Sequence, residues 1–310
     1  MRRQPSSHTL KKNTMETDNC PLVSIVVITY NSSATVLETL ESIKNQSYKN
    51  IELIISDDCS TDNTQSLVRL WLGKNENALL FKRTLLISTP KNGGPAVNCN
   101  HGIRNSRGAW FKLIAADDIL LPDCIKNNVE YVTKHNNVQI VFSKLICFGE
   151  NDEIANFQDN INWNFWKLTR KQQYLLILLD NQIMAPTQFV KKEVWERLNG
   201  YDENIPFIED WPFWIKAYKS GIMIVFLDEL TVKYRIHESL SCMSSPSKIY
   251  INSLQLAKEY ARKCQYEVNP LLRFYDFVRG NVHSYIIRII LFIWNPYYWY
   301  IKQIQTKMNT

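Results

Sequence analysis

Several common signatures are missing from this sequence of 310 residues. Its seven cysteines include no Cys-x-x-Cys pair, which argues against a zinc site, and their irregular spacing fits reduced thiols in a cytosolic protein. There is no GxGxxG fingerprint and no Walker loop, so a dinucleotide enzyme or a P-loop NTPase is disfavoured. Residues 1–20 are polar and lack the apolar core of a signal peptide, and we expect a disordered leader there.

Charge is unevenly distributed along the chain. Apolar residues make up 45% and charged residues 21%, as in an ordinary globular protein. The net charge is +6, and residues 241–310 alone hold nine Lys or Arg against three acids. The first 240 residues are therefore neutral overall, and the C-terminal region is the part expected to meet an anionic partner, either lipid or nucleic acid.

Apolar runs and helical patterns alternate through the first half of the chain. The runs rich in β-branched residues predict strands at residues 23–28, 51–56, 84–88, 110–115 and 138–147. The intervening patterns predict helices at residues 32–45, from 62, at 96–105 and at 122–135. This alternation predicts an α/β fold with a mostly parallel sheet flanked by helices.

The pattern is looser beyond residue 151. It predicts helices at 167–181, 189–198 and 211–219, strands at 222–227 and 231–236, and helical structure from 247 onwards. We therefore expect three parts: the leader, a catalytic or binding domain over residues 21–240, and a basic, aromatic-rich helical region over residues 241–310.

Ligands of a parallel sheet bind outside the carboxyl ends of its strands. Polar segments follow the first, second and fourth predicted strands at residues 29–31, 57–60 and 117–118. We expect all three segments to line one crevice.

Two adjacent carboxylates follow the fourth strand. Asp117 and Asp118 repel each other, and a divalent cation such as Mg²⁺ or Mn²⁺ compensates that repulsion while bridging to phosphate oxygens. The alternative is that one acid caps a turn while the other is solvated. The position after a central strand favours the metal.

Three further candidates carry titratable groups. Asp58 follows the second strand and can accept a hydrogen bond from a nucleobase or ribose, although Ser60, Thr61 and Asp62 beside it are capping residues. Glu209 and Asp210 open a predicted helix, where a carboxylate can deprotonate an acceptor hydroxyl or act as the N-cap. For His237, the roles of metal ligand and of structural, hydrogen-bonded histidine are equally supported by the sequence. Nearby Arg235 could pair with phosphate.

Taken together, these segments resemble family-2 glycosyltransferases of GT-A fold, of the kind that build bacterial polysaccharides and O-antigens. The resemblance covers residues 21–240 and rests on five motifs in order: VSIVVITYN at 23–31, IISDDCSTDNT at 54–64, AADD at 115–118 with LPD at 121–123, NGYDE at 199–203 with ED at 209–210, and YRIH at 234–237. Two departures stand out. Cys59 replaces the usual Gly, and Asn98-Cys99-Asn100 replaces an Ala-Arg-Asn whose Arg often contacts the nucleotide.

The resemblance implies an inverting transfer from a nucleotide-sugar, most simply a UDP-sugar, to a saccharide or lipid-linked saccharide. The implied roles are a nucleoside site at Thr29, Tyr30, Asn31, Asp58 and Asp117, a Mn²⁺ or Mg²⁺ ligand at Asp118 joined by His237, and a catalytic pair Glu209 and Asp210 with Asp210 as the base. Two other classes stay open: an inactive nucleotide-sugar-binding module, and a nucleic-acid-binding protein. The intact Asp118 and Asp210 disfavour the first, and the basic tail lacks a nucleic-acid-binding motif.

The C-terminal region also carries a strongly apolar segment. Residues 285–294 are apolar apart from Arg288, Asn295-Pro296 interrupts them, and residues 297–301 are again aromatic. Such a segment is short for a membrane span but suits the headgroup level of an anionic membrane. We therefore expect peripheral attachment to the inner face of the cell membrane. The alternative is a last helix packed on the domain.

Overall fold

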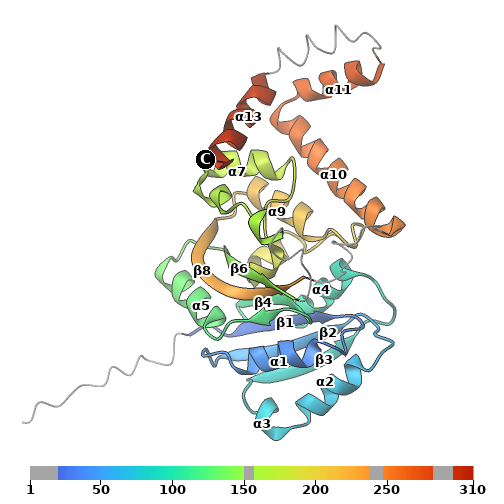
Figure 1. Cartoon of the computed structure of the whole chain (residues 1–310), viewed down its shortest axis with the longest axis vertical. Helices are drawn as coiled ribbons and strands as arrows, with labels where there is room; N and C mark the ends of the chain where they lie inside the picture. The colour runs from blue at the N-terminus through green and yellow to red at the C-terminus, as the bar shows by residue number, and fades with distance from the viewer. Residues whose placement is uncertain (1–19, 150–156, 237–246, 282–295, 310) are drawn as a thin grey trace, which may run out of the picture.

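The computed structural model describes residues 20–149, 157–236, 247–281 and 296–309 (Figure 1). Its strands form one sheet in the order β3-β2-β1-β4-β7-β6-β8-β5. The strands are β1 Val23–Thr29, β2 Ile51–Asp57, β3 Arg83–Ser88, β4 Trp110–Ala115, β5 Ile119–Leu120, β6 Ile140–Phe148, β7 Phe189–Lys191 and β8 Ile224–Arg235. The α-helices are α1 Val36–Lys44, α2 Thr64–Leu72, α3 Asn75–Ala78, α4 Pro95–Arg104, α5 Cys124–Lys134, α7 Arg170–Ile177, α8 Lys192–Arg197, α9 Asp210–Lys219, α10 Lys248–Val268, α11 Leu271–Asn281 and α13 Pro296–Asn309. Two 3₁₀ turns span Trp163–Lys167 and Ala185–Thr187.

The first four strands form a parallel half-sheet. β1 pairs in parallel with β2 and β4, and β2 pairs in parallel with β3. β7 is antiparallel to both β4 and β6, while β8 is parallel to β6 and antiparallel to β5. Parallel pairings therefore outnumber antiparallel ones, as the sequence predicts.

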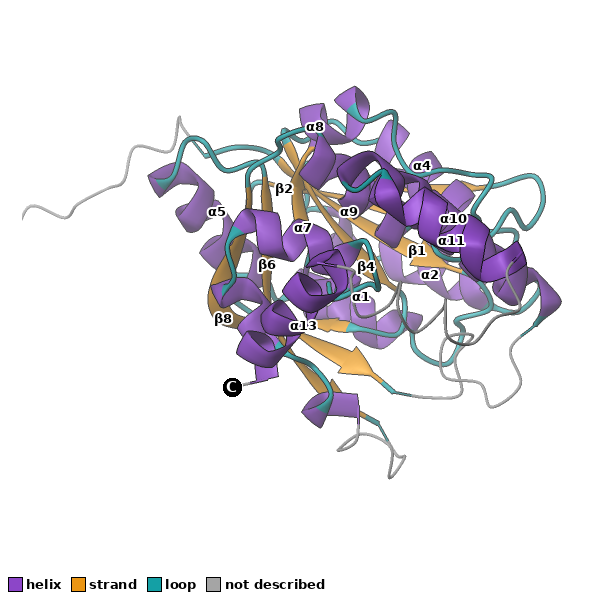
Figure 2. Ribbon diagram, turned by 90° about the horizontal axis from the view of Figure 1, so that it is seen from above, coloured by secondary structure: helices purple, strands orange, loops and turns teal. Residues whose placement is uncertain are grey.

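Helices cover both faces of the sheet (Figures 1 and 2). On one face of β1, Val23, Ile25 and Val27 pack in a core with the apolar residues of α1, α2 and α5. Val26 points the other way and packs with α4 and the aromatic residues of α9. Because both faces are buried, β1 and β2 read as continuous apolar runs rather than as alternating ones.

The predicted α/β fold, with a mostly parallel sheet flanked by helices and a helical C-terminal extension, is confirmed, but two predicted elements were wrong. The helix expected at 189–198 begins as strand β7, whose three residues pair with β4 and β6, and only Lys192–Arg197 is helical. The two strands expected at 222–227 and 231–236 are one long strand, β8. Its register against β6 shifts between Ser143, which pairs with Leu227, and Lys144, which pairs with Leu230, so the irregularity falls at the gap between the two expected strands.

The C-terminal helices lie beyond the α9 side of the sheet, away from α1 and α2 (Figure 1). α10 packs on α9, and α13 packs on α7 with Ile301 and Ile304 buried. Within the described ranges, we find no helix whose length and apolar character would let it cross a bilayer.

Candidate functional site

The acid pair predicted to hold a metal lies at the end of central strand β4. Asp118 is only 1% exposed, and its Oδ1 accepts a hydrogen bond of 2.9 Å from the backbone N–H of Arg235. Its Oδ2 is buried and has no hydrogen-bond partner in the described part of the chain. Burial, followed by the charge of Asp117, raises the pKa of Asp118 well above its ordinary value.

Arg235, at the end of β8, fixes the acid pair from the other side. Its Nε donates to the backbone oxygen of Asp117 at 2.8 Å, and its guanidinium pairs with Glu38 of α1. The same guanidinium lies 4.3 Å from the ring centroid of Phe148. β4, β8 and α1 are thereby joined at one point beside the two acids.

This arrangement fits a divalent cation. Asp118 Oδ2 is a buried carboxylate oxygen without a hydrogen-bond partner among the described residues, and a second carboxylate lies beside it. A bound cation would offset both the lost hydration and the repulsion between the two acids. No group of three or more His, Cys, Asp or Glu that could hold a metal occurs among the residues described, so Asp117 and Asp118 would leave the other positions to water or phosphate. His237, the other predicted ligand, lies outside the described residues.

Glu209 and Asp210 stand at the start of α9. The helix begins at Asp210 itself, so the N-cap alternative for Asp210 was wrong: Glu209 takes that position, without a side-chain capping bond. Asp210 Oδ1 accepts 2.7 Å from Trp211 N, and Oδ2 accepts 2.8 Å from Asn181 Nδ2. The buried face of α9, with Trp211 and Trp214, holds this end of the helix in place.

Burial shifts the titration of both acids. It raises the pKa of Glu209 from 4.5 to about 8, with help from the charge of Asp210. It also raises the pKa of Asp210, although the hydrogen bonds from Asn181 and Trp211 work in the opposite direction. Glu209 is thus the member that holds a proton at neutral pH, and Asp210 is the member best placed to be ionised.

One cavity of about 530 Å³ joins the two acid pairs. Its lining also includes residues from β1, β4, the Ala185–Thr187 turn, β8 and α10. These residues are Ile28, Pro95, Leu113, Ile114, Ala115, Asp117, Asp118, Asp180, Asn181, Ala185, Pro186, Gln188, Phe207, Ile208, Glu209, Asp210, Trp211, Tyr234, Arg235, Tyr250 and Leu254. Strand ends that are far apart in the sequence therefore contribute to one cavity, which is partly open to solvent.

The segments after β1 and β2 border this cavity without lining it, so the single crevice expected from the sequence is only partly formed. Tyr30 is 47% exposed, and Asn31 has a left-handed backbone (φ 50°) with its Oδ1 bound to Thr61 N at 2.8 Å. Thr29 is buried and pairs in register with Asp57. Thr29, Tyr30 and Asn31, here called the shelf, thus lie at the carboxyl end of β1 outside the cavity lining, and of these Tyr30 is well exposed.

Asp58 is engaged by the loop that precedes α4. Its Oδ1 accepts from Thr89 Oγ1 at 2.8 Å and from Gly93 N at 2.9 Å, and its Oδ2 accepts from Gly94 N at 2.8 Å. Gly94 has φ 83°, a conformation that favours glycine. Asp58 therefore holds the glycine loop against β2, next to Pro95 of the cavity wall.

The comparisons with known proteins agree with this geometry. A model described as "Glycosyl transferase family 2" matches residues 24–195. The chain belongs to this family.

Relatives and solved structures extend the match. An uncharacterised glycosyltransferase of Haemophilus influenzae is 31% identical over 223 residues, which is 71% of this chain and 67% of the relative. Another, from Methanocaldococcus jannaschii, is 26% identical and covers 70% of this chain and 71% of its own. Residues 1–349 of S. aureus TarS, solved with UDP-GlcNAc, share the fold with a TM-score of 0.61 at 21% identity, over 84% of this chain and 74% of that TarS fragment. A mannosyltransferase of Pyrobaculum calidifontis, solved with GDP-Man and Mn²⁺, has a TM-score of 0.54 at 16% identity, over 93% of this chain and 85% of the mannosyltransferase.

Sequence reasoning missed several residues of this glycosyltransferase's cavity. Asn181 bonds to Asp210 across 29 positions, and Tyr250 and Leu254 come from the C-terminal region that was read as a separate appendage. Asn181 lies at the end of the helix predicted for 167–181, and no local pattern distinguishes it from a solvated polar residue. These residues become visible only when long-range packing is known.

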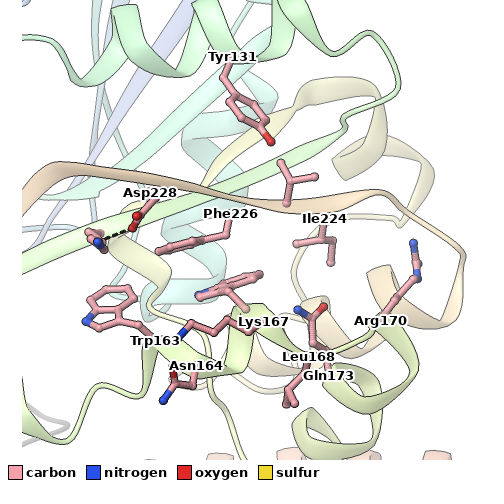
Figure 3. A pocket seen from close by; sticks show the side chains of 13 residues that line it. Tyr131, Trp163, Asn164, Lys167, Leu168, Arg170, Gln173, Ile224, Phe226 and Asp228 are labelled. Atoms are coloured by element: carbon pink, nitrogen blue, oxygen red, sulfur yellow. Dashed lines mark ion pairs between the residues drawn. The ribbon is translucent and has the colours of Figure 1, made fainter. Parts of the chain in front are cut away.

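A second cavity, of about 750 Å³, lies under the N-terminal half of β8 (Figure 3). Lys144 pairs there with Asp228, and Trp166 stacks on Phe226 with ring centroids 5.2 Å apart. Gln173 is also satisfied, because it bonds to the oxygen of Phe165 and to the hydroxyl of Tyr218. Asp228 is the only carboxylate among the described residues that line this cavity, and it pairs with Lys144, so the cavity offers no carboxylate pair for sugar transfer.

Proposed function

We propose that the chain is an inverting, metal-dependent glycosyltransferase that moves a sugar from a nucleotide-sugar to a hydroxyl of a saccharide or lipid-linked saccharide in cell-surface polysaccharide synthesis. The observation that carries the proposal is the meeting of Asp117 and Asp118 with Glu209 and Asp210 in one cavity. One pair suits the diphosphate and its cation, and the other suits the attacking hydroxyl. Membership of the family supports glycosyl transfer itself.

Asp210 is proposed as the general base. Its two oxygens accept hydrogen bonds from Asn181 and from the backbone N–H of Trp211 in the first turn of α9, which hold the carboxylate in place and favour its ionised form. Burial makes Asp210 a stronger base than a solvated aspartate. Because Glu209 holds a proton at neutral pH, it places no negative charge beside Asp210. A hydroxyl that loses its proton to Asp210 can attack the anomeric carbon from the side opposite the departing diphosphate, and the configuration inverts.

Asp118 and Asp117 are proposed to hold Mn²⁺ or Mg²⁺. When bound, the ion supplies positive charge that stabilises the nucleoside diphosphate as it departs. Arg235 keeps both acids in position through its backbone and side-chain hydrogen bonds. The pairing of Asp118 Oδ2 with a cation would also relieve its buried, unsatisfied state.

The nucleoside is proposed to lie on the shelf of Thr29, Tyr30 and Asn31, with Asp58 toward the base and Asp117 near the ribose. The exposed ring of Tyr30 can stack on a base. Each oxygen of a carboxylate has two acceptor sites, so Asp58 keeps capacity beyond its three bonds, and an acid there suits the imide N–H of uracil. We therefore favour a UDP-sugar.

The C-terminal region is proposed to rest on an anionic membrane on the cytoplasmic side, where a lipid-linked acceptor would be presented. Support comes from the concentration of the whole net charge in residues 241–310 and from the apolar segment 285–294, which lies outside the described residues.

Replacing the proposed cation ligand tests the central claim. Asp118→Ala should abolish transfer and divalent-dependent donor binding while leaving the circular dichroism spectrum unchanged. Asp123→Ala is the matched control, since Asp123 is an exposed acid five positions later that pairs with Lys126 at 4.0 Å. Full activity in excess EDTA would exclude the metal, and NMR of the product with a retained anomeric configuration would exclude single displacement.

A further inference from the structure

The lining of the catalytic cavity divides into two chemically different parts. Asp117 and Asp118 are accompanied by Arg235, which is the only Lys or Arg among the described residues that line the cavity. The remaining polar lining, apart from Gln188 and the ring hydroxyls, consists of Asp180, Asn181, Glu209 and Asp210. Among the described residues that line it, this second part has three carboxyl groups and no Lys or Arg.

Apolar and aromatic side chains complete the second part. Phe207, Ile208 and Trp211 come from the approach to α9, while Tyr250 and Leu254 come from α10. Tyr250 and Leu254 are four residues apart and therefore lie on one face of that helix. The C-terminal region thus contributes a wall to the site and is not only an appendage.

The position of α10 is fixed by buried contacts. Ser247 Oγ caps the helix by accepting 3.2 Å from Tyr250 N, and Ala257, Ala261 and Cys264 are buried in the core that includes α9. Figure 1 shows α10 running beside α9. A ring at position 250 is consequently held at the cavity and not on a free segment.

We infer that this second part binds the acceptor as a neutral, hydroxyl-rich sugar, with Tyr250 against its apolar face, and that it excludes sugars bearing phosphate or carboxylate groups. The inference rests on the proposed function. Carboxylates and the Asn181 amide accept hydrogen bonds from sugar hydroxyls, and the flat apolar ring of Tyr250 matches the C–H face of a pyranose. An anionic substituent would meet like charge from these acids, and no Lys or Arg offsets it among the described residues of this part.

A matched set of sugars tests the charge requirement. Nucleotide release from UDP-glucose, UDP-GlcNAc and GDP-mannose is measured with Mn²⁺ alone, then with equal concentrations of glucose, glucuronic acid or glucose 6-phosphate, and with the neutral sugars galactose and N-acetylglucosamine. At least one neutral sugar should accelerate release, and its charged counterparts should be less effective by about tenfold or more. Equal or greater acceleration by glucuronic acid or glucose 6-phosphate would overturn the inference.

Binding measured by saturation-transfer NMR with the same sugars decides the matter without turnover. Neutral sugars should show contact with the full chain and charged ones should not, and the absence of contact from every neutral sugar would also overturn the inference. Failure of Mn²⁺-dependent release with all three donors would instead count against the proposed function.

The role of Tyr250 is tested with substitutions on one turn of α10. Tyr250→Ala should raise the KM for the neutral sugar severalfold, and by more than any change in the KM for the donor, and Tyr250→Phe should restore the wild-type acceptor KM. Ile249→Ala is the control, because Ile249 is 59% exposed and does not line the cavity. An equal loss of donor hydrolysis in Tyr250→Ala, or no change in acceptor KM, would remove Tyr250 from the acceptor site.

Discussion

Cys59 lies in a backbone conformation that its side chain disfavours. Its φ of 60° is left-handed, in the turn between β2 and α2, where the family usually has glycine. A left-handed conformation costs a non-glycine residue about 1–2 kcal/mol. The substitution noticed in the sequence is therefore a point of backbone strain, next to Asp58.

Cys59→Gly should stabilise the fold. Relief of the strain outweighs the extra freedom of glycine in the unfolded chain, which is worth about 0.4–1 kcal/mol, and we expect a net gain of about 0.5–1 kcal/mol in urea denaturation. Asn199→Gly serves as the control, because Asn199 has φ 58° but asparagine tolerates that region. A gain no larger than that of the control would mean that Cys59 is not strained.

Glu209 makes stability depend on pH. Its pKa of about 8 in the folded protein exceeds 4.5, so the folded state holds the proton more tightly than the unfolded state between these values. Stability should therefore fall as pH rises through this window. Glu209→Gln removes the ionisation, and its stability relative to wild type should grow from about pH 5 to about pH 8 and then level off.

Urea denaturation across that pH range measures the difference, with Glu229→Gln as the control for loss of an exposed carboxylate. A Glu209→Gln difference that is flat with pH, or that shrinks as pH rises, would contradict the raised pKa.

At the scale of elements, α9 couples the packing of the core to the chemistry. The buried face of α9 places Asp210 at the cavity. Asn181, which follows α7 in the chain, donates a hydrogen bond that orients the Asp210 carboxylate. Asp210→Asn keeps the size and the helix, so it should retain donor affinity and lose about 10²–10⁴-fold in turnover. Asp202→Asn, in the loop before α9, is the control, and an Asp210→Asn enzyme within a few-fold of wild type would exclude Asp210 as the base.

Most elements of the half-sheet could be predicted because their signals are local. β1, β2 and β4 are buried on both faces, so their sequences are continuous apolar runs, and Asp117 and Asp118 follow such a run directly. β7 could not be predicted in this way. Its three residues are a strand only because β4 and β6 lie on either side of it, and that pairing joins segments far apart in the chain.

The same limit applies to the site. Asp118 and Asp210 are recognisable from their motifs, whereas Asn181 and Tyr250 acquire their positions from contacts with α9 that no local pattern records. The sequence left open whether the C-terminal aromatic segment packs on the domain or contacts a membrane. Ile301 of the segment 297–301 is buried in the core, while Trp299 near it is 50% exposed. Helix α13 is therefore in part a packed helix.

Considered as a whole, the molecule has one end where exposed apolar side chains lie within the basic C-terminal region. On α11, Leu271, Phe274 and Phe277 recur at three-residue spacing and are 60%, 57% and 66% exposed. Arg273 lies among them, and the apolar segment 285–294 follows α11 in the sequence. α3 lies at the opposite end of the long axis (Figure 1).

The α11 face should therefore carry the proposed membrane contact. Apolar residues at this spacing can enter the headgroup region, and each nearby Lys or Arg adds about 1 kcal/mol toward anionic lipid. The full chain should float with vesicles containing phosphatidylserine at low salt and float less at high salt, and a chain with Phe274→Ser and Phe277→Ser should float markedly less. Leu79→Ser provides the control, because Leu79 is 83% exposed at the end of α3, far from this face. If the full chain stays at the bottom of the gradient at low salt, the C-terminal region is not a membrane anchor, and a lipid-linked acceptor loses its support. If the double variant floats as well as the full chain, the contact lies elsewhere than on α11.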